Sequence, residues 1–202
     1  VTAADGIVVE GSDSNYLFPA PINLLPEYGS HEITSPLSEG GYYMCLPLAQ
    51  GLVVGDAPRD TVSVTELLTT SDSAYSKLSG YTMSTYEKED GDIDGPFALA
   101  VAITETLEDG GETDIIWVSS AYLLDDSTNA SISGGNEDFF LNCINWLCGS
   151  ESGISIHAKS LSTEYLTISS GTSSMLTMLV VGVIPVCFLA AGIVIWVRRK
   201  KQ

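Results

Sequence analysis

The chain has 202 residues and a formal net charge of −18, with 26 acidic residues against eight basic ones. A chain this acidic is repelled by nucleic acid and by anionic lipid headgroups, which argues against a nucleic-acid-binding role. Its length is sufficient for one domain with a hydrophobic core.

The first 55 residues predict short extended segments on both sides of a proline-rich loop. Residues 6–11 (GIVVEG) are typical of a short buried strand, because the run is β-branched. Residues 18–41 contain four prolines and predict a loop with one short helix around residues 35–39. Residues 42–55 predict an extended segment that is bent or interrupted at Pro47.

The next segment predicts a strand, a helical turn and an acidic loop. Val62, Val64 and Glu66 alternate, which predicts a strand that continues into Leu67 and Leu68. Residues 71–79 predict a helical turn capped by Ser71 or Asp72. Residues 87–94 (EKEDGDID) resemble a calcium loop in composition, but the aspartate spacing and the terminal glutamate of such loops are missing. A solvated loop is therefore expected there.

Two apolar strands are predicted over residues 97–104 and 114–120, with a turn at residues 108–112 between them. Both strands are apolar on both sides, which is typical of the central strands of a covered sheet.

The best predicted helix follows a polar loop at residues 125–135. Asn136 is expected to cap it, and Glu137 and Asp138 favour its N-terminal dipole. Its apolar stripe consists of Phe139, Phe140, Cys143, Ile144, Trp146 and Leu147, and Gly149 ends it. A last strand is predicted over residues 153–159. Apolar strands with a helix between the last two indicate a layered α/β domain with a mixed sheet, over residues 1–160.

A serine- and threonine-rich linker is predicted over residues 161–174, before an uncharged segment at residues 175–197. At about 1.5 Å per residue this segment reaches roughly 34 Å, enough to cross a hydrocarbon core of about 30 Å. The basic tail at residues 198–202 follows at once and is expected to stay in the cytoplasm, which places the domain outside. All 26 acidic residues precede the tail, with only Arg59, Lys77, Lys88 and Lys159 as cations, for a net charge of −22.

The N-terminal residues have neither the basic start nor the apolar stretch of a signal sequence. We therefore expect the chain to be the C-terminal part of a longer protein whose upstream part directs export.

The residue types that carry chemistry are sparse. The cysteines are Cys45, Cys143, Cys148 and Cys187, without a C-x-x-C pair, and only His31 and His157 could join them in a metal site, so zinc is not expected. Cys45 could form a disulfide with Cys143 or Cys148; free buried thiols are the favoured alternative. Cys187 lies in the membrane segment as an apolar filler.

No nucleophile elbow, P-loop or dinucleotide-binding glycine motif is present. Ser119 and Ser120 follow a strand, where α/β folds often place active groups, but no base stands at a readable spacing. No catalytic residue, cofactor site or metal ligand is therefore predicted. Residues 129–131 (NAS) match a glycosylation sequon, which matters only in a eukaryotic secretory pathway.

The order of several short phrases resembles the C-terminal part of the GldG-like family, the auxiliary component of ABC-2 type transporters associated with gliding motility. The matching residues are Leu68, Thr70 and Ser71; Gly95, Pro96, Phe97, Leu99, Ala100 and Val101; Ile115 to Tyr122; Gly135, Asn136, Asp138, Phe139, Asn142, Asn145, Trp146 and Leu147; and His31 to Thr34. The C-terminal span and basic tail also match. One departure is Val118-Ser119-Ser120, where the family has a Gly-Asp-Ser turn.

The resemblance implies a Rossmann-like domain related to class I glutamine amidotransferases without their nucleophile, in a bacterial cell membrane, with an ABC permease and an ATPase as partners. Asn136, Asn142 and Asn145 are expected to bond loops or cap the helix rather than bind a ligand. Trp146 is expected in the core.

The expected function is that of a non-catalytic, membrane-anchored subunit of such a transport system. A divergent hydrolase or amidotransferase that uses Ser119 or Ser120 with His157 is one alternative. A surface ligand-binding or adhesion domain that uses the loop at residues 18–41 is the other.

Overall fold

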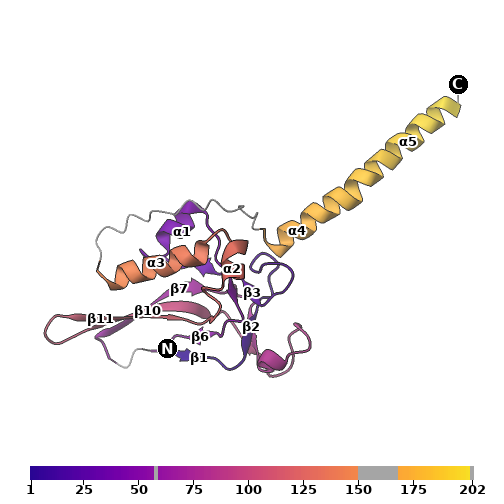
Figure 1. Cartoon of the computed structure of the whole chain (residues 1–202). Coiled ribbons are helices and arrows are strands. Elements are labelled where there is room, and N and C mark those ends of the chain that lie inside the picture. The colour runs from indigo at the N-terminus through magenta and orange to yellow at the C-terminus, as the bar shows by residue number, and fades with distance from the viewer. Residues whose placement is uncertain (57–58, 150–167, 201–202) are drawn as a thin grey trace.

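The structure is a computed structural model that describes residues 1–56, 59–149 and 168–200 (Figure 1). Its main sheet is built around β10 (Ala98–Thr106), the most buried strand of that sheet. The other strands of this sheet are β7 (Val62–Thr69), β11 (Glu112–Val118), β4 (Glu27–Tyr28), β6 (Leu52–Val53) and β1 (Thr2–Ala3).

Every pairing in the main sheet is antiparallel. β10 lies between β7 on one side and β11 on the other, and the start of β10 also pairs with β6. The prediction of a mixed sheet is therefore wrong for the described residues, and a Rossmann-like fold is not confirmed. The physical reason is the short β10–β11 turn, which returns the chain antiparallel, whereas parallel neighbours need a crossover connection. The strand predicted over residues 153–159 lies outside the described residues.

Two small antiparallel sheets complete the strands. One contains β2 (Ile7–Val9), β8 (Tyr75–Lys77) and β9 (Ile93–Asp94), and the other contains β3 (Asn23–Leu24) and β5 (Leu46–Pro47). The buried strand predicted at residues 6–11 and the interruption near Pro47 are confirmed, because β5 ends at Pro47 and β6 begins at Leu52. The helical turn predicted at residues 71–79 is wrong: pairing with β2 and β9 makes residues 75–77 a strand.

The β10–β11 hairpin is confirmed, but only β10 has the predicted central position. Residues 98–102 are buried, whereas β11 is an edge strand whose Ile115 is 54% exposed. The prediction that both strands are covered on both sides is therefore wrong for β11. Apolar composition alone does not separate an edge strand with an apolar outer side from a buried one.

Two short helices connect the strands. α1 (Ser35–Gly40) is confirmed where it was predicted, with Pro36 in its first turn and Gly41 as a left-handed C-cap at φ 67°. α2 (Asp126–Ser131) falls in the predicted polar loop, where the Asp125 side chain accepts a hydrogen bond from the Thr128 N–H at 2.9 Å. A single 3₁₀ turn, η1 (Gly80–Thr82), follows β8.

The predicted helix after the polar loop is confirmed as α3 (Gly135–Leu147). Its N-cap is Gly134, at φ 90°, so the prediction that Asn136 caps it is wrong. α1 and α3 lie on one face of the main sheet (Figure 1), and the main hydrophobic core fills the space between. This core includes Leu37 of α1, Phe139 and Cys143 of α3, and Leu67, Leu68, Leu99, Ala100 and Ala102 of the sheet.

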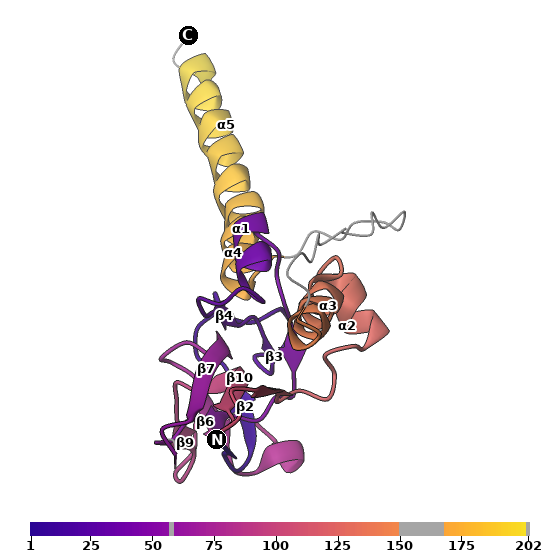
Figure 2. The ribbon, with the colours of Figure 1, turned by 90° about the vertical axis from the view of Figure 1, so that its left-hand side faces the viewer.

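A long apolar helix leaves this layered body near the C-terminus (Figures 1 and 2). It consists of α4 (Ser170–Thr177), a π-helical segment η2 (Met178–Val183) and α5 (Ile184–Lys200). The 31 residues have a mean hydropathy of 2.8 in their most apolar window, so this helix is long and apolar enough to cross a membrane. It begins inside the stretch predicted as a linker. The π turns precede Pro185, whose ring has no N–H and crowds the carbonyl four residues earlier, so a wider turn accommodates it.

Candidate functional site

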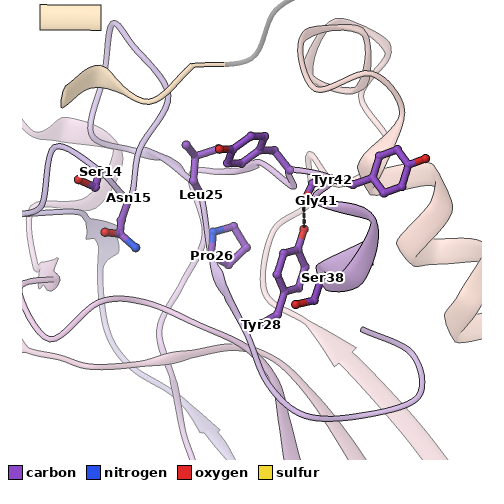
Figure 3. A pocket seen from close by; sticks show the side chains of 9 residues that line it. Ser14, Asn15, Leu25, Pro26, Tyr28, Ser38, Gly41 and Tyr42 are labelled. Atoms are coloured by element: carbon purple, nitrogen blue, oxygen red, sulfur yellow. Dashed lines mark hydrogen bonds between the residues drawn. The ribbon is translucent and has the colours of Figure 1, made fainter. Parts of the chain in front are cut away.

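An open groove lies in the proline-rich region (Figure 3). It encloses about 310 Å³ and is lined by Ser14, Asn15, Leu25, Pro26, Tyr28, Ser38, Gly41, Tyr42 and Tyr43. None of these residues is charged, although the protein is strongly acidic. Most of its lining residues belong to residues 18–41, the loop that the surface ligand-binding alternative uses.

Tyr28 forms one side of the groove and is fixed by the fold. It lies on β4, opposite Leu68 of β7, and its hydroxyl donates a hydrogen bond to the Tyr42 carbonyl at 2.9 Å (Figure 3). Burial of the ring, with a smaller contribution from Tyr43, raises the pKa of the Tyr28 phenol above its ordinary value. Tyr28 is therefore a neutral hydrogen-bonding group, unsuited to act as a base.

Asn15 forms part of the opposite side and is also held by neighbours. Its amide donates to the Glu27 carboxylate at 3.3 Å, its side-chain oxygen accepts from the Ser12 hydroxyl at 2.9 Å, and its carbonyl accepts from the Leu25 N–H at 2.8 Å. Both sides of the groove are thus held in place. Aromatic rings beside hydroxyl and amide groups suit an uncharged polar ligand.

The long helix is joined to the body close to this groove. The Gly171 N–H donates to the Asp13 carbonyl at 2.8 Å, and the Ser170 N–H donates to the Tyr16 carbonyl at 3.3 Å. The Ser170 hydroxyl also donates to the Tyr16 hydroxyl at 3.2 Å, and Leu17 forms an isolated bridge with Ser169. Ser170 is buried by these contacts. The first turn of the helix is therefore docked on the loop that contributes Ser14 and Asn15 to the groove.

The two serines of the hydrolase alternative follow β11, and neither hydroxyl bonds a described histidine or carboxylate. The Ser120 hydroxyl donates to the Pro47 carbonyl at 2.6 Å and accepts from the Tyr122 N–H at 3.2 Å. The Ser119 hydroxyl is buried and has no hydrogen-bond partner among the described residues. His157, the base expected to serve them, lies outside the described residues.

His31 contacts an aromatic ring rather than a nucleophile. Its ring meets the Trp146 ring edge-on, with centroids 5.4 Å apart, and its Nδ1 accepts from the Ile33 N–H at 3.2 Å. Burial lowers the pKa of His31, and the nearby Glu32 opposes this only in part. Trp146, expected in the core, is half-buried and packs against it.

Asn136 and Asn142 of α3 bond loops, as expected. The fully buried Asn136 side chain accepts from the Cys45 N–H at 3.0 Å and donates to the Cys45 and Leu123 carbonyls at 2.7 and 2.9 Å. Asn142 donates to the Ile33 carbonyl at 3.0 Å, and Asn145 is half-buried on the same helix. Asn136 thereby fixes α3 to the segment that continues into β5.

All four cysteines are free. Cys45 and Cys143 are buried, and burial raises the pKa of each thiol to about 12, so both are unreactive at neutral pH. Cys148 is exposed at the end of α3 and Cys187 on the long helix. No group of three or more histidine, cysteine or acidic side chains suited to a metal ion occurs within the described part of the chain.

The acidic loop at residues 87–94 is organised around Lys77, a contact that was not predicted from the sequence. The Lys77 side chain is fully buried, and its Nζ donates to the Glu87 carbonyl at 2.5 Å, to Glu89 at 2.9 Å and to Asp92 at 3.3 Å. Burial disfavours the charged amine, but the bonds to Glu89 and Asp92 outweigh it and raise the pKa of Lys77. The two carboxylates are therefore engaged by Lys77.

The sequon asparagine is not available at the surface. Asn129 is 5% exposed, and its side-chain oxygen accepts from the Glu137 N–H at 3.3 Å. It joins α2 to the first turn of α3.

Comparison with known protein families, with curated proteins and with solved structures gives no match for this chain.

Proposed function

We propose that this protein is a non-catalytic, membrane-anchored auxiliary subunit of an ABC-2 type transport system of the GldG-like kind. The acidic domain lies outside a bacterial cell membrane, the long helix crosses it, and the basic tail lies in the cytoplasm. The partners are an ABC permease and its ATPase. The family's Rossmann-like domain needs parallel strands, which the described antiparallel sheet lacks, so the proposal rests on motif order and on the anchor.

The observation that carries the proposal is the docking of the anchor on the domain. Asp13 and Tyr16 hold Gly171 and Ser170 through backbone hydrogen bonds, only a few residues before the apolar stretch that starts at Met175. Such an attachment keeps the domain close to the bilayer. A subunit that works beside a permease needs this proximity, because its partner emerges from the same membrane.

The geometry of the serines supports a non-catalytic role. Ser119 and Ser120 are turned into the protein, and no described histidine or carboxylate bonds either hydroxyl. An activated nucleophile needs such a base within hydrogen-bond reach.

The proposal is tested by purification of the full chain from native membranes in mild detergent. We expect the permease and the ATPase to be recovered with it in fixed proportion. The control is residues 170–202 fused to an unrelated domain, which should recover neither. Recovery of the full chain alone would contradict the proposed function.

The groove favours a second candidate function, the binding of an uncharged polar ligand at the cell surface. Its lining combines three tyrosines with serine and asparagine and carries no charge. A panel of neutral oligosaccharides tested against the protein and against Tyr43→Ala checks this. The candidate predicts binding by the parent chain that the variant loses, and no binding by either protein would remove it.

A further inference from the structure

The solvent-exposed side of α3 is apolar, where a surface helix normally carries polar residues. Phe140 is 38% exposed, Leu141 55%, Ile144 41% and Leu147 42%. These four residues are called the α3 outer face below. Cys148, also exposed, lies at its end.

Core packing among residues 1–56, 59–149 and 168–200 does not account for the α3 outer face. The adjoining side of the helix supplies the core contacts, through the buried side chains of Phe139 and Cys143, and the buried Asn136 bonds the neighbouring loops. Residues 140, 144 and 147 are spaced four and three apart, so they align in one stripe with Leu141 beside it. A stripe of this spacing suits packing against another helix.

The charge of the protein restricts what covers this face. The residues before the tail carry a net charge of −22, and the exposed Glu137 lies at the N-terminal end of the face. A second copy would bring an equal negative charge, and an anionic bilayer surface would also be repelled. An apolar helix flanked by lysine or arginine is complementary both to the stripe and to its surroundings.

The place of α3 in the fold indicates where that helix comes from. The α1–α3 layer covers the side of the main sheet from which the anchor helix leaves, as the two views show (Figures 1 and 2). A partner on this side therefore lies between the domain and the membrane.

We propose that the α3 outer face binds an extracytoplasmic amphipathic helix of the permease, with an apolar stripe flanked by basic residues. This inference rests on the proposed function, since it names the contact between the two subunits. The hydrophobic stripe supplies the affinity, and the acidic surroundings favour a basic partner over a second copy.

The first test compares two charge substitutions in the full chain. The double variant Leu141→Glu/Ile144→Glu places carboxylates in the stripe. The matched control, Leu107→Glu, changes a leucine of similar exposure (43%) at the β10–β11 turn. We expect the double variant to lose at least about tenfold of the permease recovered from membranes, and the control to stay within about twofold of the parent. Equal recovery by parent and double variant would overturn the inference and leave the proposed function intact.

The second test follows the alkylation of Cys148 by a polyethylene-glycol maleimide. Cys148 is the exposed thiol outside the anchor among the described residues, and unreactive Cys45 and Cys143 report that the domain is folded. We expect Cys148 to be protected in native membranes and to react in protein purified from a host that lacks the permease and in liposomes that contain this chain alone. Protection in the purified protein would mean that the chain covers its own face, and protection only in liposomes would mean that lipid covers it. Either result overturns the inference.

The two tests separate the two proposals. If the parent chain recovers neither permease nor ATPase, the proposed function fails. The α3 outer face is then judged by Cys148 in native membranes. If Cys148 is protected there, and if Leu141→Glu/Ile144→Glu relieves this protection while Leu107→Glu does not, the α3 outer face still binds a helix. The partner is then a protein other than the transporter. Free reaction of Cys148 there would overturn both.

Discussion

Replacement of Asn136 by alanine tests the account of how α3 is fixed to the domain. The Asn136 side chain is fully buried and makes three hydrogen bonds, to the Cys45 N–H, the Cys45 carbonyl and the Leu123 carbonyl. At about 1 kcal/mol for each net hydrogen bond, Asn136→Ala should reduce the free energy of unfolding by about 3 kcal/mol. A typical domain has about 5–15 kcal/mol, so the variant should unfold at clearly lower denaturant concentration.

The assay is urea unfolding of the detergent-solubilised full chain, followed by tryptophan fluorescence with Trp146 of α3 as a reporter. The matched control is Asn142→Ala, on the same helix, which removes one side-chain bond to the described residues, to the Ile33 carbonyl at 3.0 Å. We expect a loss of about 1 kcal/mol for this control. The reasoning is refuted if Asn136→Ala costs no more than Asn142→Ala.

Three further predictions concern other parts of the domain. Burial opposes ionisation of Asp92, but hydrogen bonds from the Glu89 and Leu78 N–H groups and from the Lys77 amine outweigh burial and lower the pKa of Asp92. The ionised Asp92 therefore stabilises the fold above the ordinary carboxyl pKa, and this stabilisation is lost as the pH falls through the lowered pKa. The parent chain should therefore lose more unfolding free energy than Asp92→Asn between about pH 6 and pH 3, and equal losses would contradict the prediction. An added Cβ at Gly135 would lie 2.0 Å from the Tyr43 carbonyl oxygen, whereas one at Gly134 meets nothing within 4 Å. Gly135→Ala should therefore lower the thermal unfolding midpoint more than Gly134→Ala. The Gly134 variant has only the cost of a left-handed φ at alanine, about 1 kcal/mol. The reverse order would show that α3 does not approach the Tyr43 backbone. Asn129 is 5% exposed, so folded protein from a eukaryotic secretory host should carry no glycan there. Gel mobility before and after glycosidase treatment checks this. A folded product that is fully glycosylated would show that Asn129 is not buried.

The elements that could be predicted from the sequence are those with strong local signals. The uncharged run at residues 175–197, the apolar pattern of α3, the proline at the start of α1 and the β10–β11 hairpin were all located correctly. The strand β8 and the antiparallel order were not, because both depend on partners far along the chain, such as Val9 for Tyr75. The helix α2 was missed because five of its six residues are polar, and its capping signal at Asp125 stood in a run that is equally typical of a loop.

The groove could not be predicted as a site, because distant segments build it. Asn15, Tyr28 and Tyr42 come together only after β4 has paired with β7 and α1 has packed against α3. Its one sequence signal is the density of tyrosines around the prolines. The role of Lys77 had a weak signal: it precedes the acidic run at residues 87–94, but that run contains Lys88, which pairs with Asp94.

The most direct test of the account is the side of the membrane on which each end of the chain lies. In a Cys148→Ser background, Glu108→Cys places a thiol at the exposed β10–β11 turn, and Gln202→Cys places one in the basic tail. A membrane-impermeant maleimide added to intact cells should label the thiol at position 108 and reach that at position 202 only after permeabilisation. Labelling of position 202 but not position 108 in intact cells would contradict an outward-facing domain held by a single membrane-spanning helix.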